Sequence, residues 1–562
     1  MKILTIHVDY IKFKPLKKAL KNAEITEEEK KEKEVKEALV VLTAVEKTDR
    51  DENQYIKEIK DISNQVKTKT IVLYPYAHLS SNLASPETAV EIMKNAEKKL
   101  SKEGYNVIRA PFGFYKEFEL KCKGHPLSEL SREIKQEGKV EEKEGYNPKQ
   151  LLNEISKSVL DTSKLKENDH RILGKKMDLF SFNETAPGAV FWHNNGLIIY
   201  NELIKFWREE HKKAGYKEIS TPQILDKKLW QISGHWEKYR ENIFLTEYEK
   251  RTFAVKPMNC PGGLLVYKSA PKSYKDLPLR VAELGIVHRQ ELSGVLGGLF
   301  RLVRFTQDDA HIFCMDEKQV EKEIINLMKL VDKFYKKFSL PYHLELSTRP
   351  EKRIGSDKIW DISESILKKV LKKSKKKFKL NKGDGAFYGP KIDFHIKDSL
   401  GRTWQLATIQ LDFAMPERFD LEYTDKNNKK QKPIMIHRTI YGSLERFIGI
   451  LLEHLNGNLP AWLSPIQVRV ISFTDRNRKT CEKFIRQVGE KIPYLRLDAD
   501  FRDMTVNSKV RDAEISGVKY IIVIGDKEEK SKTLAVRDKG RVSNQKVERF
   551  INDIRKEIIE RR

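Results

Sequence analysis

Cysteine is scarce in this sequence, and long apolar runs are missing. Only four cysteines, Cys122, Cys260, Cys314 and Cys481, occur among 562 residues, and their wide spacing does not form a disulfide framework. We therefore expect a reducing compartment, the cytoplasm. No apolar run reaches the ~18 residues of a membrane span, and no segment resembles a signal peptide. Both absences argue against a secreted or membrane protein.

Acidic residues are outnumbered by basic ones, which gives a net charge of +25. Such a surplus suits a polyanionic partner. A charged fraction of 34% also fits the Lys and Glu enrichment of hyperthermophile proteins, and both explanations can hold. The densest basic run, residues 370–382, either contacts RNA or is a solvated insertion. A chain of 562 residues is too long for one domain, so three or more are expected.

Three side chains that bind metals each lie in a segment of their own. Cys260 lies in KPMNCPG, His311 in RFTQDDAHIF and His437 in MIHRTIYGSLERF. One thiolate and two imidazoles suit a zinc ion with a fourth position left for water or substrate. Because metal ligands need only converge in the fold, we expect these three residues to meet.

The segment around His311 alternates with the period of a strand. Arg301, Gln307, Asp309 and His311 fall on one face of it. A face this polar does not build an ordinary core, because buried polar groups need partners. A solvated strand face is the alternative for His311 alone, but Gln307 and Asp309 beside it favour a functional site.

Two further segments carry arginines of a kind that binds anions. Residues 280–291 form a second expected strand, with Arg289 and Glu291 on one face, and a glycine-containing loop joins it to the next strand. Arginine clamps carboxylates and phosphates with two hydrogen bonds, although a surface ion pair is the alternative. Arg446 lies beside the apolar stripe of an expected helix and needs an anionic partner, either a triphosphate or a structural carboxylate.

These segments resemble motifs 2 and 3 of the class II aminoacyl-tRNA synthetases. The sequences KPMNCPG, FTQDDAHIF, FYGPKIDF, TWQLATIQLDF and IHRTIYGSLERFIGILLEH closely resemble the threonyl-tRNA synthetase family. The resemblance runs from about Asp169 to the C-terminus. It implies a ligase that converts L-threonine and ATP to threonyl-adenylate and pyrophosphate, then transfers threonine to the 3′ end of tRNA(Thr).

The resemblance also implies a role for each matching residue. Cys260, His311 and His437 would hold one zinc ion per subunit, the threonine amino and hydroxyl groups would complete its coordination, and magnesium would accompany ATP. Arg289 and Arg446 would be catalytic. Threonine would be contacted by Met258, Arg289, Gln307, Asp309, Tyr388, Gln405 and Gln410. ATP would be contacted by Arg289, Glu291, Arg301, Lys391, Ser443 and Arg446.

Serine presents a problem of specificity that points to the N-terminal region. Serine has the hydroxyl group of threonine and lacks only a methyl group, worth about 1–3 kcal/mol, so a second, hydrolytic site is expected. The sequences YPYAHLSSNLASP and APFGFYKEFELKCKGHPLSELSR resemble the archaeal-type editing domain, whose fold is similar to D-aminoacyl-tRNA deacylases. Lys116 would be the main editing residue, with His78, Tyr115 and Glu129 around it. An ordinary surface position is the alternative for Lys116.

We therefore expect a multidomain α/β protein. Residues 1–140 would form the deacylase-like editing domain, 141–168 a linker with one helix, 169–464 a catalytic domain with an antiparallel sheet, and 465–562 an α/β anticodon-binding domain. A segment similar to motif 1 implies a homodimer. The expected partners are tRNA(Thr), ATP and L-threonine, with no membrane contact.

Three alternative functions fit the sequence less well. A regulatory paralogue without activation chemistry should have lost Arg289 or Arg446, and both are present. A synthetase for serine or proline conflicts with the Cys/His/His set and with TQDDAH. A stand-alone deacylase leaves the activation motifs of the larger half unexplained.

Overall fold

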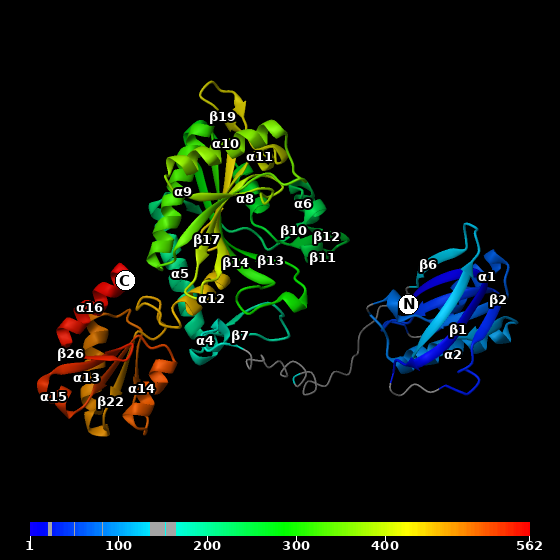
Figure 1. Cartoon of the computed structure of the whole chain (residues 1–562), viewed down its shortest axis with the longest axis horizontal. Helices are drawn as coiled ribbons and strands as arrows, with labels where there is room; N and C mark the ends of the chain where they lie inside the picture. Colours follow the sequence, from blue (N-terminus) through cyan, green and yellow to red (C-terminus); the bar gives the residue numbers. More distant parts are fainter. Residues whose placement is uncertain (21–24, 50, 81, 135–151, 153–164) are drawn as a thin grey trace. The chain divides into compact units, whose positions relative to one another are not determined.

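The computed structural model describes residues 1–20, 25–49, 51–80, 82–134, 152 and 165–562. The chain forms two compact units, Met1–Tyr146 and Asn147–Arg562 (Figure 1). Most of the linker expected over 141–168, including its helix, lies outside the described residues.

A six-stranded sheet forms the first unit, in the order β4-β3-β2-β1-β5 with β6 also paired to β1. Its strands are β1 (Lys2–Lys18), β2 (Lys33–Ala44), β3 (Thr70–Pro75), β4 (Asn106–Arg109), β5 (Phe114–Cys122) and β6 (Glu129–Glu133). Strands β2, β3 and β4 are parallel, and β1 is antiparallel to β2, β5 and β6.

Two helices, α1 (Asn53–Val66) and α2 (Pro86–Lys102), cover one face of this sheet. Leu39 and Val41 of β2 pack against them, whereas Val40 belongs to the core on the other face. A strand buried on both sides explains the continuous apolar run in β2. The amphipathic pattern at 87–100 predicts a helix, and α2 confirms it.

An eight-stranded sheet forms the centre of the second unit, in the order β16-β15-β17-β18-β21-β14-β13-β9. The strands are β9 (Lys217–Glu218), β13 (Leu279–His288), β14 (Arg304–Cys314), β15 (Tyr342–Ser347), β16 (Phe378–Asn381), β17 (Lys391–Lys397), β18 (Thr403–Asp412) and β21 (Ile434–Thr439). Pairing is antiparallel from β15 to β13 and parallel only at the edge strands β16 and β9.

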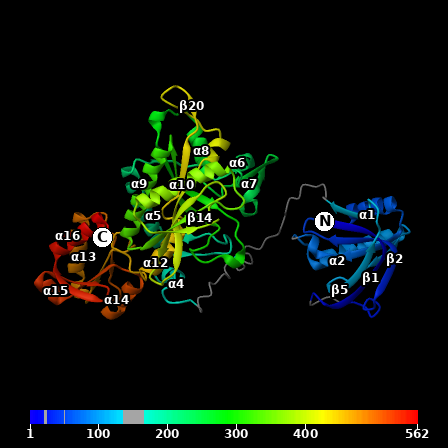
Figure 2. The ribbon, with the colours of Figure 1, turned by 45° about the horizontal axis from the view of Figure 1, so that its top comes forward.

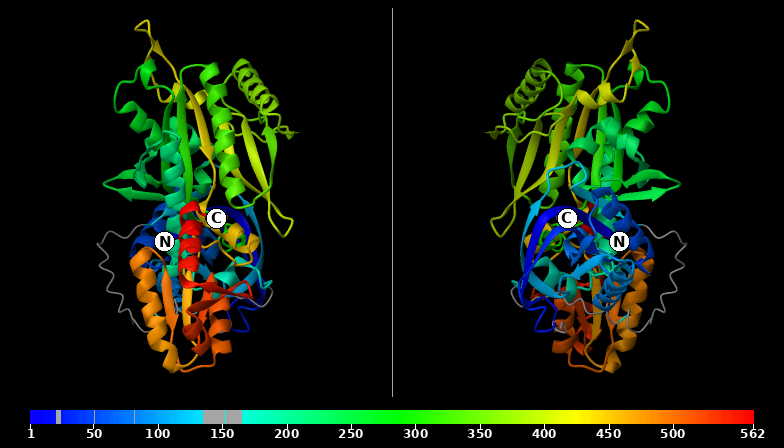
Figure 3. Two further views of the ribbon diagram at one scale, coloured as in Figure 1. Left: turned by 90° about the vertical axis from the view of Figure 1, so that its left-hand side faces the viewer. Right: turned by 90° about the vertical axis from the view of Figure 1, so that its right-hand side faces the viewer.

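Helices pack against the long strands of this sheet (Figures 2 and 3). They are α4 (His170–Lys176), α5 (Asn194–Lys213), α8 (Cys260–Lys268), α9 (Glu317–Lys337), α10 (Asp357–Lys373) and α12 (Leu444–His454). Ala310 and Ile312 of β14 share a core with α5, α9 and α12, whereas Phe313 packs with α8 on the opposite face. The alternation of β14 thus turns Gln307, Asp309 and His311 away from the main helical core.

Shorter elements border the central sheet. They are β7 (Phe180–Ser181), β8 (Phe191–Trp192), β10 (Ile224–Asp226), α6 (Lys227–Ser233), α7 (His235–Lys238), β11 (Leu245–Tyr248), β12 (Arg251–Val255), α11 (Ala414–Arg418), β19 (Tyr423–Thr424) and β20 (Lys430–Gln431).

The hairpin expected over 280–313 is present, but its strands are shorter at the loop end. β13 ends at His288 and β14 begins at Arg304, so Arg289, Glu291 and Arg301 lie in the connection between them. The prediction that these three residues lie on strand faces is wrong. The backbone N–H of Val303 donates to the Gly188 carbonyl at 2.8 Å and not to β13, which ends the regular pairing.

A five-stranded sheet, in the order β23-β22-β24-β25-β26, forms the C-terminal part of the second unit. Its elements are β22 (Val468–Ser472), α13 (Arg478–Lys491), β23 (Leu497–Asp500), α14 (Val506–Ile515), β24 (Tyr520–Ile524), α15 (Asp526–Ser531), β25 (Thr533–Asp538), β26 (Arg541–Lys546) and α16 (Val547–Glu560). The predicted multidomain α/β class is confirmed. Among the helices that the structure describes, none has the length and apolar character that a membrane crossing requires.

Candidate active site and editing pocket

Cys260, His311 and His437 converge on one side of the central sheet. His311 and His437 are directly opposed partners on the neighbouring strands β14 and β21, so their side chains leave the sheet on the same face. Cys260 is the first residue of α8, which packs on that face. One ligand atom from each residue lies within 4.8 Å of the others, and all three residues are buried.

The donor atoms of this cluster fit a metal ion. Nε2 of His437 lies 2.8 Å from the Asp412 carboxylate, which orients the ring and leaves Nδ1 free. Nε2 of His311 is buried and has no hydrogen-bond partner in the part of the chain that the structure describes. Burial lowers the pKa of His311 and keeps it neutral, as a metal ligand must be.

The Cys260 thiol needs a nearby cation to ionise. Burial raises its pKa well above the ordinary value, and the charges of Asp309 and Asp412 raise it further. A bound metal ion reverses this effect, because a coordinating thiol is deprotonated. The chemistry of the three donors therefore suits a soft to borderline cation such as Zn²⁺.

A cavity of about 480 Å³ opens beside this cluster. It is lined by Cys260, His437 and eleven other residues singled out in the sequence: Met258, Arg289, Glu291, Arg301, Gln307, Asp309, Tyr388, Gln405, Gln410, Ser443 and Arg446. Its polar walls and size suit a small charged ligand.

Two of the residues singled out in the sequence do not line the cavity. His311 is buried beneath it. The ammonium group of Lys391 lies 2.9 Å from the Asp393 carboxylate, whose other oxygen accepts a hydrogen bond from Gln405 at 2.5 Å. Lys391 therefore contacts the cavity wall through Asp393 and Gln405.

Three guanidinium groups make the cavity suitable for anions. Arg289 donates to the Pro257 carbonyl at 3.1 Å, and Arg446 donates to the Phe300 carbonyl at 2.8 Å. Arg301 is paired with Glu291 at 2.9 Å. Because neither Arg289 nor Arg446 has a carboxylate partner among the described residues, both retain unsatisfied charge for a phosphate or carboxylate.

Asp309 supplies the opposite charge near the metal-ligand cluster. Burial raises the pKa of its carboxyl group to about 6. One of its oxygens lies 3.9 Å from Nε2 of His311. Asp309 can therefore accept a hydrogen bond from a hydroxyl or ammonium group bound beside the cluster.

A second cavity, of about 550 Å³, lies in the N-terminal unit. His78, Tyr115 and Lys116 line it, together with Tyr74, Met93 and Phe112. Glu129 is not among the lining residues; it lies on β6, and its carboxylate accepts a contact from the Cys122 thiol at 3.6 Å. The mostly apolar wall suits a small side chain or a nucleotide base.

Lys116 is the half-buried cation of this second cavity. Its ammonium group donates to the carbonyls of Pro111 at 2.9 Å and Phe114 at 3.1 Å, and lies 5.0 Å from the centre of the Tyr74 ring. Burial lowers the pKa of Lys116 to about 8. Lys116 is thus not an ordinary surface lysine.

Comparison with known proteins identifies the family. Three family models match consecutive parts of the chain: the archaea-specific editing domain of threonyl-tRNA synthetase at 1–134, the class II synthetase core domain (G, H, P, S and T) at 244–455, and an anticodon binding domain at 467–561. The crystal structure of the RNA binding domain of threonyl-tRNA synthetase from Cryptosporidium parvum is 38% identical, with a TM-score of 0.66 and coverage of 69% of this chain and 98% of that one.

The chain belongs to the threonyl-tRNA synthetase family. Threonine–tRNA ligases of Natranaerobius thermophilus and Carboxydothermus hydrogenoformans are 52% and 50% identical over 395 and 399 residues. These matches cover 70% and 71% of this chain, and the chain spans 62% of the length of each relative. The predicted family, including the archaeal type of editing domain, is confirmed.

The resemblance implies no role for some residues that support this synthetase-family site. The backbone N–H of Ile440 donates to both carboxylate oxygens of buried Asp308. Oδ1 of Asp308 also accepts a hydrogen bond from the backbone N–H of Gly442, and Oδ2 accepts one from the Trp207 indole at 3.2 Å. Asp308 thereby fixes the turn that leads to Ser443. Its place in FTQDDAHIF, directly before Asp309, is the sequence signal for it.

Two more buried groups support the same side of the sheet. The Lys256 ammonium group lies 2.9 Å from the Glu283 carboxylate, and both side chains are almost fully buried. This ion pair joins the segment before Cys260 to β13. His235 is also buried. Its pKa is lowered to about 3, mainly by burial and to a smaller extent by the charges of His437 and Arg289.

Proposed function

We propose that this chain is a threonine–tRNA ligase that activates L-threonine with ATP and transfers it to the 3′ end of tRNA(Thr). The observation that carries the proposal is the convergence of Cys260, His311 and His437 beside a cavity with arginines on its walls. A metal-ligand set next to an anion-binding cavity matches a small amino acid and a nucleotide bound side by side. Membership of the threonyl-tRNA synthetase family supports the same conclusion.

We further propose one zinc ion per subunit, held by Cys260, His311 and His437. When bound, zinc supplies a Lewis acid that the amino and hydroxyl groups of threonine can ligate. Asp309 would accept a hydrogen bond from the hydroxyl group. Met258, Gln307, Tyr388, Gln405 and Gln410 would form the remaining walls around the amino acid.

The arginines would carry most of the activation step. The threonine carboxylate attacks the α-phosphate of ATP, the new bond is a mixed anhydride, and pyrophosphate leaves. Arg289 would hold the carboxylate and the α-phosphate together, while Arg301 and Arg446 would neutralise the leaving phosphates. Glu291, Ser443 and Lys391 would complete the ATP site, and magnesium would accompany ATP.

We propose that the N-terminal cavity hydrolyses seryl-tRNA(Thr). The Lys116 cation can polarise the ester carbonyl or orient a water molecule, with Tyr115 and His78 on the same cavity wall. Glu129 remains a proposed contributor from outside that wall. The match of residues 1–134 to the archaea-specific editing domain supports this assignment.

The division of the chain also remains a proposal. We assign residues 1–140 to editing, 141–168 to a linker, 169–464 to activation and transfer, and 465–562 to the anticodon. We also propose a homodimer, through the motif 1 segment, and a cytoplasmic location, consistent with the four widely spaced cysteines.

Aminoacylation of tRNA transcripts tests the proposed function. We expect the purified chain with ATP and magnesium to attach labelled threonine to tRNA(Thr) and not to tRNA(Ser) or tRNA(Pro). The control is the variant Arg289→Ala, which should lose about 10²- to 10³-fold in rate, the usual cost of removing one electrostatic group from an active site. Equal charging of all three transcripts, or none with threonine, would refute the assignment.

Removal of residues 1–140 separates the two activities. Because Met1–Tyr146 is a compact unit of its own, we expect the shortened chain to activate threonine at the rate of the intact chain. Seryl-tRNA(Thr) should then accumulate, because the proposed hydrolytic cavity is gone. Charging and deacylation assays on the intact and the shortened chain measure threonine activation and the accumulation of seryl-tRNA(Thr). Full clearance of seryl-tRNA(Thr) by the shortened chain would place editing elsewhere.

A further inference from the structure

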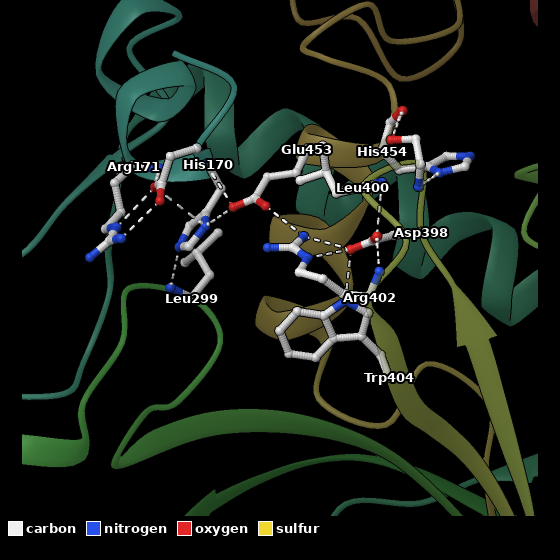
Figure 4. A network of polar contacts seen from close by, with 11 residues as sticks. His170, Arg171, Leu299, Asp398, Leu400, Arg402, Trp404, Glu453 and His454 are labelled. Atoms are coloured by element: carbon white, nitrogen blue, oxygen red, sulfur yellow. Dashed lines mark hydrogen bonds and ion pairs between the residues drawn. The ribbon is translucent and has the colours of Figure 1, made fainter. Parts of the chain in front are cut away.

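Buried His170 and Glu453 form a chain of polar contacts with the half-exposed Arg402 behind the wall of the first cavity (Figure 4). His170 begins α4, Glu453 lies near the end of α12, and Arg402 immediately precedes β18. Nδ1 of His170 lies 2.6 Å from Oε1 of Glu453, and Oε2 of Glu453 lies 2.6 Å from Nη2 of Arg402. Figure 4 shows the Glu453 carboxylate between the two side chains.

The Arg402 cation serves both carboxylates of this chain of contacts. Arg402 also donates through Nε to Asp398 at 2.7 Å, and the same Asp398 oxygen accepts from the Trp404 indole at 2.9 Å. Burial alone would raise the pKa of Glu453, but hydrogen bonds from His170 and then from Arg402 outweigh it and lower the pKa. Glu453 is therefore an anion inside the core, held by partners on both sides.

The partners of His170 also fix the position of its ring proton. The backbone N–H of Leu299 donates to Nε2 at 2.9 Å, so Nε2 carries no proton. The proton therefore lies on Nδ1, which donates to Glu453. Ligand atoms of Asp169, His170 and Glu453 lie within 4.8 Å of one another, but neither ring nitrogen has a free lone pair for a metal ion. This cluster is a hydrogen-bond network and not a metal site.

Leu299 belongs to the sequence GGLF, residues 297–300, of which Leu299 and Phe300 form part of the cavity wall. The Phe300 ring lies 4.2 Å from the His170 ring and 4.6 Å from the Trp404 ring, measured between ring centres. The Arg402 guanidinium carbon lies 5.4 Å from the centre of the Phe300 ring. The network therefore contacts both the backbone and the side chains of this wall segment.

The same segment holds Arg446. The Phe300 carbonyl accepts a hydrogen bond from Nε of Arg446 at 2.8 Å, and Arg446 has no carboxylate partner among the described residues. Phe300, Trp404 and Arg446 all line the cavity. A shift of residues 299–300 would move the only protein acceptor that the Arg446 guanidinium group has within the described chain.

Two glycines show how closely the segment is packed. Gly298 has a φ of +53°, and a Cβ atom there would lie 2.2 Å from Nε2 of His170. On the other side, a Cβ atom at Gly449 of α12 would lie 2.9 Å from the Phe300 ring. The segment is therefore held between α4 and α12 with little room to shift.

We propose that His170 is a positioning residue for ATP binding, which acts through Leu299 and Phe300 on Arg446. The network His170–Glu453–Arg402–Asp398 holds the wall segment in the position that turns the Arg446 guanidinium group toward the phosphates. This inference rests on the proposed ligase function. His170 does not line the cavity, and its contacts lead to Arg446, so we expect its replacement to affect ATP and not threonine.

The ATP and threonine dependence of pyrophosphate exchange tests this role. We expect His170→Ala to raise the KM for ATP by about 10- to 100-fold, because a binding group misplaced by a distant mutation can cost about 10²-fold. The KM for threonine should stay unchanged. His170→Gln should recover part of the ATP affinity, because its side-chain carbonyl can accept the Leu299 N–H. The control His343→Gln replaces a half-exposed histidine of β15 and should change neither constant.

Gly449→Ala tests the inference without removing a polar group. Alanine favours a helix over glycine, so α12 should remain folded, while the new methyl group displaces Phe300. We again expect a higher KM for ATP with an unchanged KM for threonine. Equal changes in both constants, or an unchanged KM for ATP in folded His170→Ala and Gly449→Ala proteins, would overturn the proposal.

Calorimetric titration with ATP separates this inference from the proposed function. Loss of ATP affinity in His170→Ala supports the positioning role even in a chain that does not activate threonine. Equal ATP affinity in the intact chain and the variant refutes the positioning role even in an active ligase.

Discussion

Replacing Cys260 with alanine should reduce threonine-dependent ATP–pyrophosphate exchange by about 10³-fold, the upper end of the cost of removing one electrostatic group from an active site. The thiolate is the only anionic donor among the three clustered residues, and two neutral imidazoles bind a divalent cation much less tightly. The bound metal should be lost together with the activity. Metal content by mass spectrometry and exchange rates, measured on the same preparations, check both expectations.

Cys314→Ala is the matched control for this variant. Cys314 is also a buried cysteine, the last residue of β14, but it belongs to the core beneath the helices and not to the metal-ligand cluster. We expect this variant to keep its zinc and its exchange activity, with only a loss of stability from the smaller side chain. Normal threonine activation by metal-free Cys260→Ala protein would contradict the proposed zinc site.

Replacing Lys116 with alanine should slow the hydrolysis of seryl-tRNA(Thr) by about 10²-fold and leave threonine activation unchanged. Lys116 is the cation that lines the N-terminal cavity, and its ammonium group is already oriented by two backbone carbonyls. The variant should therefore accumulate seryl-tRNA(Thr) when serine is supplied. Deacylation of preformed seryl-tRNA(Thr) measures the effect directly.

The pH profile of hydrolysis distinguishes a Lys116 that acts as a cation from a Lys116 that acts as a neutral base. The pKa of Lys116 is lowered to about 8 by burial, so its cation is present below that pH and is lost above it. If the cation assists hydrolysis, the difference in rate between the intact chain and Lys116→Ala falls as pH rises through about 8. Lys121→Ala, an exposed lysine of the same strand paired with Asp9, should match the intact chain throughout. A difference that grows above that pH would instead indicate a neutral amine acting as a base.

Local sequence patterns predict those features of the fold and the site that depend on a single strand or helix. The strand period of β14 places Gln307 and Asp309 on the face that lines the cavity, because side chains alternate along any strand. The helical period of 87–100 predicts α2 for the same reason. Donor chemistry singles out Cys260 with the two histidines, whereas only a family motif identifies Lys116, because that position does not stand out in composition or spacing.

Long-range contacts are the part that local patterns do not predict. Glu129 lies apart from Lys116 because β6 pairs with the first residues of β1, whereas Lys116 of β5 pairs with Pro15 further along β1. His170 and Glu453 are separated by almost three hundred residues, and only the packing of α4 on α12 brings them together. No periodic signal encodes such a pair.

The proposed site makes a graded prediction for three similar amino acids. Valine has nearly the shape of threonine, and an apolar pocket separates such pairs by only about 10²-fold, whereas a site built around the hydroxyl group rejects the analogue without it by about 10⁴- to 10⁵-fold. Serine keeps the hydroxyl group and lacks one methyl group, which is worth about 1–3 kcal/mol. The first cavity should therefore exclude valine and admit serine, and the second cavity should remove the serine product.

ATP–pyrophosphate exchange by the zinc-loaded chain with threonine, serine and valine tests the central claim most directly. We predict strong exchange with threonine, weaker exchange with serine and almost none with valine. Comparable exchange with valine and threonine would contradict a pocket that selects for the hydroxyl group. No exchange with any of the three would contradict the proposed ligase activity.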